Sequence, residues 1–378
     1  MTPFEILENL LKKSKSLNPK KVNSVIVEKV DIVIKNIDKN KSLVSALITS
    51  LLKKLITPNQ DIRFHRTDFK NGYSARSLDT QVTATFFKNH FPRYSNKETA
   101  FLTLATREKI PWTLKEGKNL KIRNEKLKKA FLEILNDVQV KKEDPEFYLL
   151  YFLFQLTNLS RRDEKIFEIS NNKKEINQIT NINVIISMFK EHFNLKYSSR
   201  LPVIAIYSAY QELMKVIKRY NNKILKPLNV HTSSDKHSFG DIEIYNKEGT
   251  PFEIIEIKHN LPIDRYMIFD ILKKSKNTRI ERYYILTTNT DNFQSKEEEN
   301  FISELILKIK QEHNIEIIAN GIIPSLKYYL RFVDYYFRFM DNYISNLVIE
   351  AKSSTEVNIS HIKKWKELLI KYNIEKLK

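Results

Sequence analysis

The chain has 378 residues, and its 64 Lys and Arg against 45 Asp and Glu give a formal net charge of +19. A charge this far from zero points to a polyanionic partner, while 42% hydrophobic residues are enough for a packed core. The absence of Cys excludes disulfides, cysteine zinc sites and thiolate nucleophiles, and only 5 Gly and 11 Pro disfavour a loop-rich or disordered chain.

The first part of the chain is predicted to be mainly helical. Apolar residues recur at helical spacing up to Thr57-Pro58, which predicts a stop. Helices are expected again over 124–135 and 147–156, and Asp144-Pro145 between them indicates a domain boundary. We therefore predict a mainly helical N-terminal domain over residues 1–145.

A change of period indicates a second domain over 146–378, with its core at about 204–345. Helices are expected at 204–220, 264–275, 297–313 and 324–350, and strands at 241–245, 252–258, 283–288 and 315–319. Asn246-Lys-Glu-Gly249 supplies a turn, so the first two strands should form a hairpin. The alternation of strands and helices predicts a mixed sheet flanked by helices.

Three charged residues of the predicted hairpin are suited to catalysis. Glu256 and Lys258 are two apart in a strand and project from one face, while Ile255 and Ile257 enter the other. Asp241 lies on the partner strand, so the three charges should meet at one end of the sheet. Two carboxylates can hold Mg²⁺ at a phosphodiester, and an ammonium can position water. The alternative is a solvent-exposed hairpin edge, because Glu-x-Lys recurs by chance in such a chain.

Asp241 followed, fifteen positions on, by Glu256-x-Lys258 resembles the PD-(D/E)xK nuclease superfamily. Over about residues 204–290 the chain looks like a type II restriction endonuclease, although Gly240 replaces the usual Pro. The resemblance implies an α/β (α+β) restriction-endonuclease-like core with Mg²⁺ as cofactor. It also implies Asp241 and Glu256 as metal ligands and Lys258 beside the nucleophilic water.

Members of this superfamily often add a helical Glu to the metal site, and we carry this over to Glu212, whose alternative is an ordinary surface residue. The polar loop before the first strand contains His231, Ser234 and Asp235, which could contact the scissile phosphate. Turn capping is the alternative for these residues. His259 is expected to point to the opposite face and to be structural.

Two groups of residues are expected to contact DNA. The candidate recognition surface lies in short non-helical pieces and consists of Arg63, His65, Arg66, Tyr73, Ser74, Arg76 and Arg107. Backbone binding without sequence readout is its alternative. A run of cations without an intervening acid suits a phosphate track, with a solvated basic face as the alternative: Lys215, Lys218, Arg219 and Lys223. The aromatic residues of 328–339 are expected to pack in a core or dimer rather than to stack on bases.

The sequence predicts a Mg²⁺-dependent type II restriction endonuclease that hydrolyses double-stranded DNA at a specific sequence. One active site cuts one strand, so we expect a homodimer, and the absence of GxxxxGK[ST] predicts no nucleotide cofactor. We expect a cytoplasmic bacterial protein without a secretory signal or a membrane span. The alternatives are a repair or modification-dependent nuclease on the same core, a non-catalytic DNA-binding protein, and an RNA-binding protein.

Overall fold

The computed structural model describes residues 1–171, 180–228, 238–276, 278–372 and 374, with the backbone alone at 169–171. The chain divides into two compact units. Unit 1 comprises Met1–Phe167 and Lys352–Thr355, and unit 2 comprises Glu168–Ala351 and Glu356–Lys378. The expected boundary at residue 145 coincides with the start of helix α8 (Pro145–Asn171), whereas the division into units falls inside this helix.

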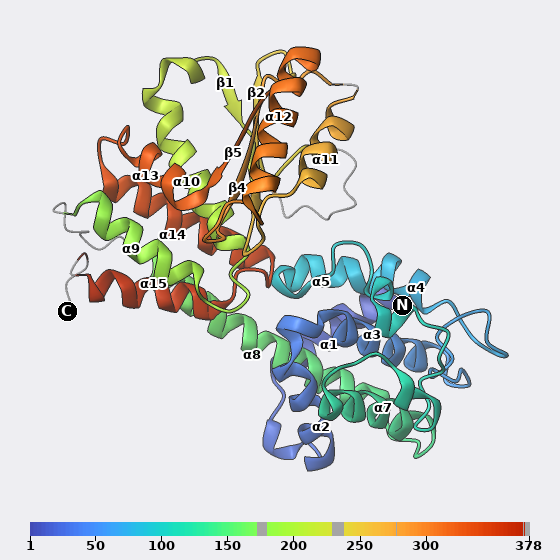
Figure 1. Ribbon diagram of the computed structural model, residues 1–378. Coiled ribbons are helices and arrows are strands. Elements are labelled where there is room, and N and C mark those ends of the chain that lie inside the picture. The colour runs from blue at the N-terminus through green and yellow to red at the C-terminus, as the bar shows by residue number, and fades with distance from the viewer. Residues whose placement is uncertain (172–179, 229–237, 277, 373, 375–378) are drawn as a thin grey trace. The chain divides into compact units, whose positions relative to one another are not determined.

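Unit 1 is helical (Figure 1). Besides the start of α8, its α-helices are α1 (Pro3–Ser14), α2 (Ser24–Lys35), α3 (Ile37–Ile56), α4 (Ala75–Leu78), α5 (Ala84–His90), α6 (Leu104–Arg107) and α7 (Glu125–Gln139). One hydrophobic core joins the long helices and includes Leu7, Val30, Leu47, Phe131 and Phe152. The end of α3 at Ile56 confirms the stop predicted at Thr57-Pro58.

Several short helical turns complete the chain. They are η1 (Pro19–Lys21), the π-helical η2 (Asp79–Thr83), η3 (Pro92–Tyr94), η4 (Ala100–Leu102), η5 (Glu116–Asn119) and η6 (Lys218–Tyr220). All except η6 belong to unit 1, where most of them lie between α3 and α7.

Unit 2 is built on a five-stranded mixed sheet of order β1-β2-β3-β4-β5. The strands are β1 (Lys223–Leu225), β2 (Ile242–Asn246), β3 (Pro251–Lys258), β4 (Arg282–Thr287) and β5 (Glu316–Gly321). β1, β2 and β3 pair antiparallel, while β3, β4 and β5 pair parallel. The fold is therefore α+β with a mixed sheet, as the alternation of elements predicted.

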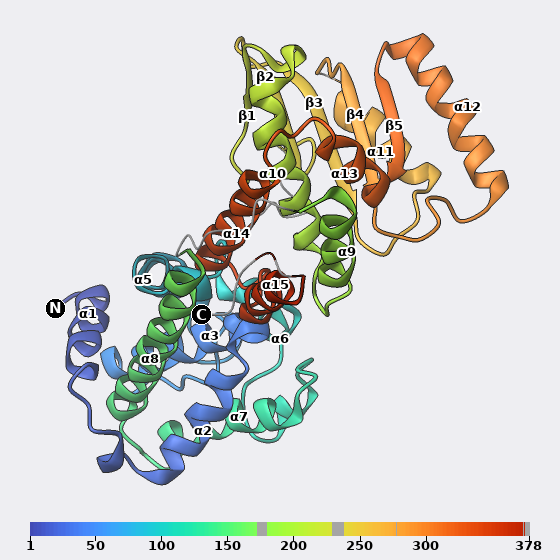
Figure 2. The same cartoon turned by 90° about the vertical axis from the view of Figure 1, so that its left-hand side faces the viewer.

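Helices cover both faces of this sheet (Figures 1 and 2). The helices of unit 2 after α8 are α9 (Ile182–Phe193), α10 (Arg200–Val216), α11 (Arg265–Ser275), α12 (Lys296–His313), α13 (Ile322–Leu330), α14 (Tyr336–Ser353) and α15 (Ile359–Lys371). On one face, Ile268 of α11 and Ile302 of α12 share a core with Ile254 and Ile285. On the other, α10 packs against β1, and α13 packs against β4 and β5.

The structure confirms the β2–β3 hairpin. Gly249 has φ +81°, which glycine adopts without steric cost, and it closes the turn. Gly240 immediately precedes Asp241, and a Cβ there would lie 2.6 Å from Cγ2 of Ile254 and 2.9 Å from the carbonyl oxygen of Ile255. β3 can approach the start of β2 this closely because residue 240 has no side chain.

The long helix expected over 324–350 is wrong, because the chain turns between α13 and α14. The backbone N–H groups of Phe332 and Val333 donate to carbonyls three residues back, and Val333 is buried in the turn. The unbroken aromatic pattern conceals this break. The sequence also does not predict β1, α9 and α15: β1 has only three residues, α9 directly follows the Asn-rich stretch 171–181, and lysines interrupt the apolar pattern of α15.

A buried ion pair connects α10 to α14. Nε and Nη2 of Arg200 lie 2.7 and 2.9 Å from Oε2 and Oε1 of Glu350, and the two residues are 6% and 5% exposed. Such a bidentate pair is geometrically specific, and the burial of both charges makes each depend on the other.

We expect Glu350→Ala to lower the free energy of unfolding of unit 2 by about 3–5 kcal/mol, because it leaves the buried Arg200 charge without its bidentate partner. The exposed Glu248→Ala is the matched control and should change it by less than about 0.5 kcal/mol. Differential scanning calorimetry of the full chain measures both. An unfolding transition of Glu350→Ala at the wild-type temperature would contradict the expectation.

Candidate active site

Asp241 is fixed to β3 by two hydrogen bonds on either side of Glu256. The backbone N–H of Asp241 donates to the carbonyl oxygen of Ile255 at 2.9 Å. Its Oδ2 accepts from the backbone N–H of Ile257 at 2.8 Å. The hairpin thereby holds the Asp241 and Glu256 carboxylates as neighbours, as the sequence predicted.

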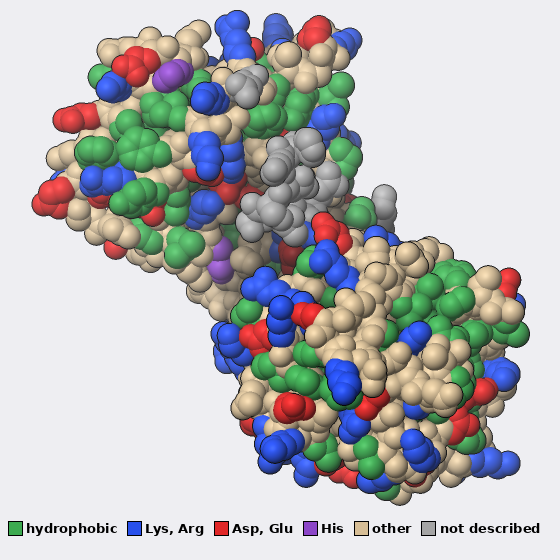
Figure 3. All heavy atoms as spheres, turned by 90° about the vertical axis from the view of Figure 1, so that its right-hand side faces the viewer, with side chains coloured by type: hydrophobic (Ala, Val, Ile, Leu, Met, Phe, Trp, Pro, Cys, Tyr) green, Lys and Arg blue, Asp and Glu red, His purple; other side chains and the backbone are tan. Residues whose placement is uncertain are grey.

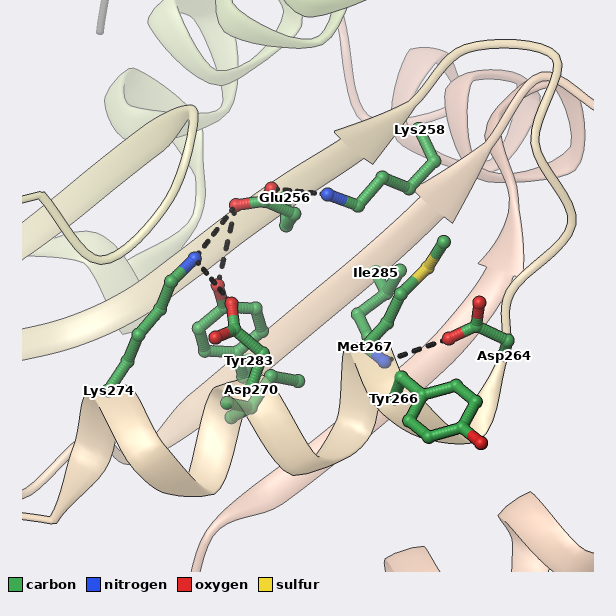
Figure 4. Close-up of a pocket in the computed structure, with 10 residues that line it drawn as sticks. Glu256, Lys258, Asp264, Tyr266, Met267, Asp270, Lys274, Tyr283 and Ile285 are labelled. Atoms are coloured by element: carbon green, nitrogen blue, oxygen red, sulfur yellow. Dashed lines mark hydrogen bonds and ion pairs between the residues drawn. The ribbon is translucent and has the colours of Figure 1, made fainter. Parts of the chain in front are cut away.

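Glu256 lies between several polar groups (Figure 4). Nζ of Lys258 is 2.7 Å from Oε1 of Glu256, so the predicted proximity of these two residues is observed. Nζ of Lys274, on α11, is 3.8 Å from Oε2, and the hydroxyl of Tyr283, on β4, is 3.5 Å from the same oxygen. Glu256 is therefore paired with two cations, one at each carboxylate oxygen.

A cavity of about 220 Å³ opens beside these groups. Its walls come from β3, β4, α11 and the residue before α11: Glu256, Lys258, Asp264, Tyr266, Met267, Asp270, Ile271, Lys274, Tyr283 and Ile285. The side chains of Glu256 and Lys258 are 20% and 26% exposed, so a ligand can reach them. Asp264 accepts from the backbone N–H of Met267 at 2.9 Å, which starts α11 at this cavity (Figure 4).

The electrostatics of the site follow from burial and from the neighbouring charges. Burial and the negative charge of Glu256 raise the pKa of Asp241 from 3.8 to about 6. Burial alone would lower the pKa of Lys258, but the carboxylates of Glu256 and Asp241 outweigh it, and that pKa lies above its ordinary value. At neutral pH the site thus combines two carboxylates that repel each other with an ammonium group.

Asp241 and Glu256 fit a Mg²⁺ ion. Both offer carboxylate oxygens, and Mg²⁺ is commonly bound by one or two carboxylates together with water and substrate phosphate. Burial and the neighbouring charge of Glu256 both raise the pKa of Asp241, and a cation would offset both effects. In the described part of the chain, no group of three or more Asp, Glu or His side chains is arranged to hold a metal, so the protein ligands would be these two.

Glu212 does not join this pair, which corrects the expectation for it. Its Oε1 accepts from Nζ of Lys215 and from Nδ2 of Asn342, each at 2.6 Å. Arg200, the first residue of α10, interacts electrostatically with Asp241. Glu212 lies twelve residues after Arg200, which is roughly 18 Å along the helix axis at the rise of an α-helix.

Two residues of the candidate recognition surface are buried in unit 1 and cannot contact DNA as expected. His65 is 1% exposed and stacks on Trp112 at 3.8 Å between ring centroids. Burial lowers its pKa to about 4, so it carries no charge for a phosphate at neutral pH. Tyr73 is 7% exposed and donates to Oγ of Ser50 at 3.2 Å.

The other recognition residues differ in availability. Arg63 is paired with Asp61 at 2.7 Å, Arg66 is paired with Asp68 at 2.8 Å, and Ser74 caps α4. Among the residues of the predicted recognition surface, the side chains of Arg76 and Arg107 are exposed, and no hydrogen bond or ion pair of theirs is seen within the described ranges. These two are the residues of the predicted surface that could accept a phosphate without breaking an ion pair.

The predicted phosphate track is also partly engaged with the protein. Arg219 lies over the ring of Phe252 at 4.5 Å, and Lys223 lies over the same ring at 4.2 Å. Lys215 is exposed but pairs with Glu212, and Lys218 is exposed. The loop residues expected near the scissile phosphate lie outside the described residues: His231, Ser234 and Asp235.

His259 has the structural role expected of it. Its Nδ1 is 3.0 Å from Oγ1 of Thr288 and its Nε2 is 3.1 Å from Oγ of Ser198. Sequence reasoning missed Lys274, Asp270 and Tyr283. The sequence does show that Asp270 and Lys274 are spaced i, i+4 on a helix and that Tyr283 lies in a strand with alternating side chains. Neither pattern shows that this helix or this strand lies beside Glu256.

On the face of the molecule shown in Figure 3, positive charge is dispersed. In Figure 3, Lys and Arg side chains of each unit lie among acidic and hydrophobic ones on the face in view. Despite the net charge of +19, the Lys and Arg side chains do not form one continuous basic patch on this face.

No protein-family model matches the chain, and a search of curated proteins also finds no match. None of the helices in the described residues is both long and apolar enough to cross a membrane. The functional interpretation consequently depends on the geometry of the site.

We expect Asp241→Asn to be more stable than the wild type at pH 7.5, by up to about 3 kcal/mol, because the charge of Asp241 is disfavoured in the folded state. Below about pH 4 the carboxyl is protonated in both folded and unfolded chains, so the difference should vanish there. Between pH 4 and 6 it should grow as the pH rises. Melting temperatures of both proteins across pH 4–8 test this, and a less stable variant at pH 7.5 would refute it.

Proposed function

We propose that the protein is a Mg²⁺-dependent nuclease of the PD-(D/E)xK type that hydrolyses phosphodiester bonds in double-stranded DNA. The observation that carries the proposal is the arrangement of Asp241, Glu256 and Lys258 at paired strands, with Glu256 and Lys258 lining an accessible cavity. The hairpin places two carboxylates together despite their repulsion, and it adds an ammonium at hydrogen-bond distance.

Each residue has a role in this mechanism. Asp241 and Glu256 hold Mg²⁺, which when bound supplies positive charge at the scissile phosphate and makes water easier to deprotonate. The ammonium of Lys258 donates hydrogen bonds to the attacking water or to a phosphate oxygen and stabilises the negative charge that develops in the transition state. The bond from the Ile257 backbone N–H keeps Asp241 oriented throughout.

We further propose a restriction-endonuclease-like core and a sequence-specific, type II activity. Support for the core comes from the element order α10, β1, β2, β3, α11, β4, α12, β5, with the three charges on the central hairpin. In this proposal unit 1 reads DNA and exposes Arg76 and Arg107 for contact. Cleavage of both strands at a symmetric sequence requires two active sites, which a homodimer provides.

One observation favours a non-catalytic DNA-binding protein as a second candidate. Glu256 is already paired with Lys258 and Lys274, and Glu212 lies elsewhere, so the carboxylate set is small. A repair or modification-dependent nuclease would use the same site chemistry. These alternatives differ from the main proposal in what they do to unmodified duplex DNA.

We expect Asp241→Asn, Glu256→Gln and Lys258→Gln each to slow cleavage of unmethylated phage DNA by at least about 100-fold, because each removes a metal ligand or a transition-state donor. DNA binding should persist in all three. Lys247→Gln and Glu248→Gln, exposed at the hairpin turn, are matched controls and should cleave normally. Gel analysis with Mg²⁺ or chelator measures cleavage.

The outcomes separate the candidates. Discrete Mg²⁺-dependent fragments support a site-specific nuclease, whereas a smear supports a nonspecific or structure-selective one. Cutting of methylated DNA alone supports a modification-dependent enzyme. Binding without cleavage of either DNA would reject the nuclease and leave the DNA-binding protein, and preference for single-stranded RNA would leave an RNA-binding protein.

We expect Arg76→Ala and Arg107→Ala each to weaken DNA binding by about 3–10-fold. Each should also reduce the slope of log K against log salt concentration by about 1, the value for one lost phosphate contact. Arg123→Ala changes an exposed Arg of the same unit outside the predicted surface and is the matched control. Fluorescence anisotropy over a range of salt concentrations measures both effects. Equal losses in all three variants would remove any special role for the two arginines.

A further inference from the structure

Lys274 reaches the candidate active site from α11. Its Nζ lies 3.8 Å from Oε2 of Glu256 and 3.2 Å from Oδ2 of Asp270 (Figure 4). The Lys274 side chain is 31% exposed and lines the cavity that Glu256 and Lys258 also line. The sequence motif of the hairpin does not include Lys274, because Lys274 belongs to α11.

The pair with Asp270 does not account for the position of Lys274. The Asp270 side chain is 55% exposed, and exposed ion pairs on a helix contribute little to stability. Lys273, the preceding residue of α11, is exposed and does not line the cavity. Of Lys273 and Lys274, it is therefore Lys274 whose ammonium lies at the cavity, between Asp270 and Glu256.

Lys258 and Lys274 approach different oxygens of one carboxylate. Lys258 is 2.7 Å from Oε1, while Lys274 is nearer to Oε2. A phosphodiester also presents two non-bridging oxygens that carry its negative charge, and ammonium groups bind such oxygens as strong donors. Both lysines line the cavity, so a phosphate bound there could accept hydrogen bonds from the two ammonium groups that now contact Glu256.

We propose that Lys274 is a second phosphate-binding residue of the active site. Without DNA it neutralises Glu256, and with DNA bound its ammonium donates hydrogen bonds to a non-bridging oxygen of the scissile phosphate. The proposal rests on the nuclease function proposed above. Because Lys274 and Mg²⁺ both use the Glu256 carboxylate, Lys274 also weakens Mg²⁺ binding in the absence of DNA.

The experiment compares Lys274→Gln with Lys273→Gln, which removes the same charge from the adjacent position, and with Lys274→Arg, which keeps it. In single-turnover cleavage at saturating DNA, Lys274→Gln should be slower by about 100-fold, and Lys274→Arg should recover part of the loss. Calorimetric titration of the DNA-free proteins with MgCl₂ should show Lys274→Gln binding about fivefold more tightly. Lys273→Gln should match the wild type in both measurements.

A gain in Mg²⁺ affinity together with a loss of cleavage rate is a result that a purely structural residue would not produce. If the wild type cleaves and Lys274→Gln behaves as Lys273→Gln does, the role of Lys274 is overturned while the nuclease stands. If Lys274→Gln cleaves slowly but melts at a lower temperature and binds Mg²⁺ unchanged, the residue is structural and the proposal fails. Absence of cleavage by the wild type overturns the nuclease function and this role with it.

Discussion

The close pairing of β2 with β3 around Gly240 is the constraint on which the candidate active site depends. Asp241 is buried beside the carboxylate of Glu256, and burial, followed by the negative charge of Glu256, raises the pKa of Asp241. Backbone bonds to Ile255 and Ile257 hold Asp241 there, and they form because residue 240 has no Cβ to hold the strands apart. The paired strands thus keep the two carboxylates side by side, which is the arrangement that the proposed Mg²⁺ site requires.

β3 shows how one strand gives two glutamates opposite roles. Glu253 points to the α10 side, is fully buried, and accepts hydrogen bonds from the hydroxyls of Tyr210 at 2.6 Å and Tyr220 at 2.9 Å. Burial raises the pKa of Glu253, and Glu253 does not line the cavity that Glu256 lines. Glu256 faces α11 with lysines and an accessible cavity. An offset of three residues in a strand reverses the face, so Glu253 is hydrogen-bonded inside the layer between sheet and helix while Glu256 borders an accessible cavity.

Sequence reasoning was strongest where local pattern decides the structure. Alternating charges and isoleucines, with Gly249 in the turn, were enough to predict the hairpin and the neighbours Asp241, Glu256 and Lys258. It failed where tertiary contacts decide. Glu212 lies on a helix in the expected register, but its partner Asn342 is 130 residues away. His65 is polar by type, yet the fold buries it against Trp112, whose position no local pattern gives. Lys274 could not be selected over Lys273, because the packing of α11 on the sheet determines which of them points at Glu256.

The balance of charge in the site has a consequence for the order of binding in the proposed mechanism. Lys258 and Lys274 already contact the carboxylate of Glu256. In the proposed mechanism, Mg²⁺ therefore competes with both lysines for this carboxylate. A DNA phosphate that attracts the lysines frees Glu256 for the metal, and a bound metal that displaces the lysines frees them for phosphate. By thermodynamic linkage, each ligand then strengthens the binding of the other by the same factor. In the proposed mechanism, such a site would bind Mg²⁺ more tightly with DNA present than without it, which would favour the metal-assisted reaction on bound DNA.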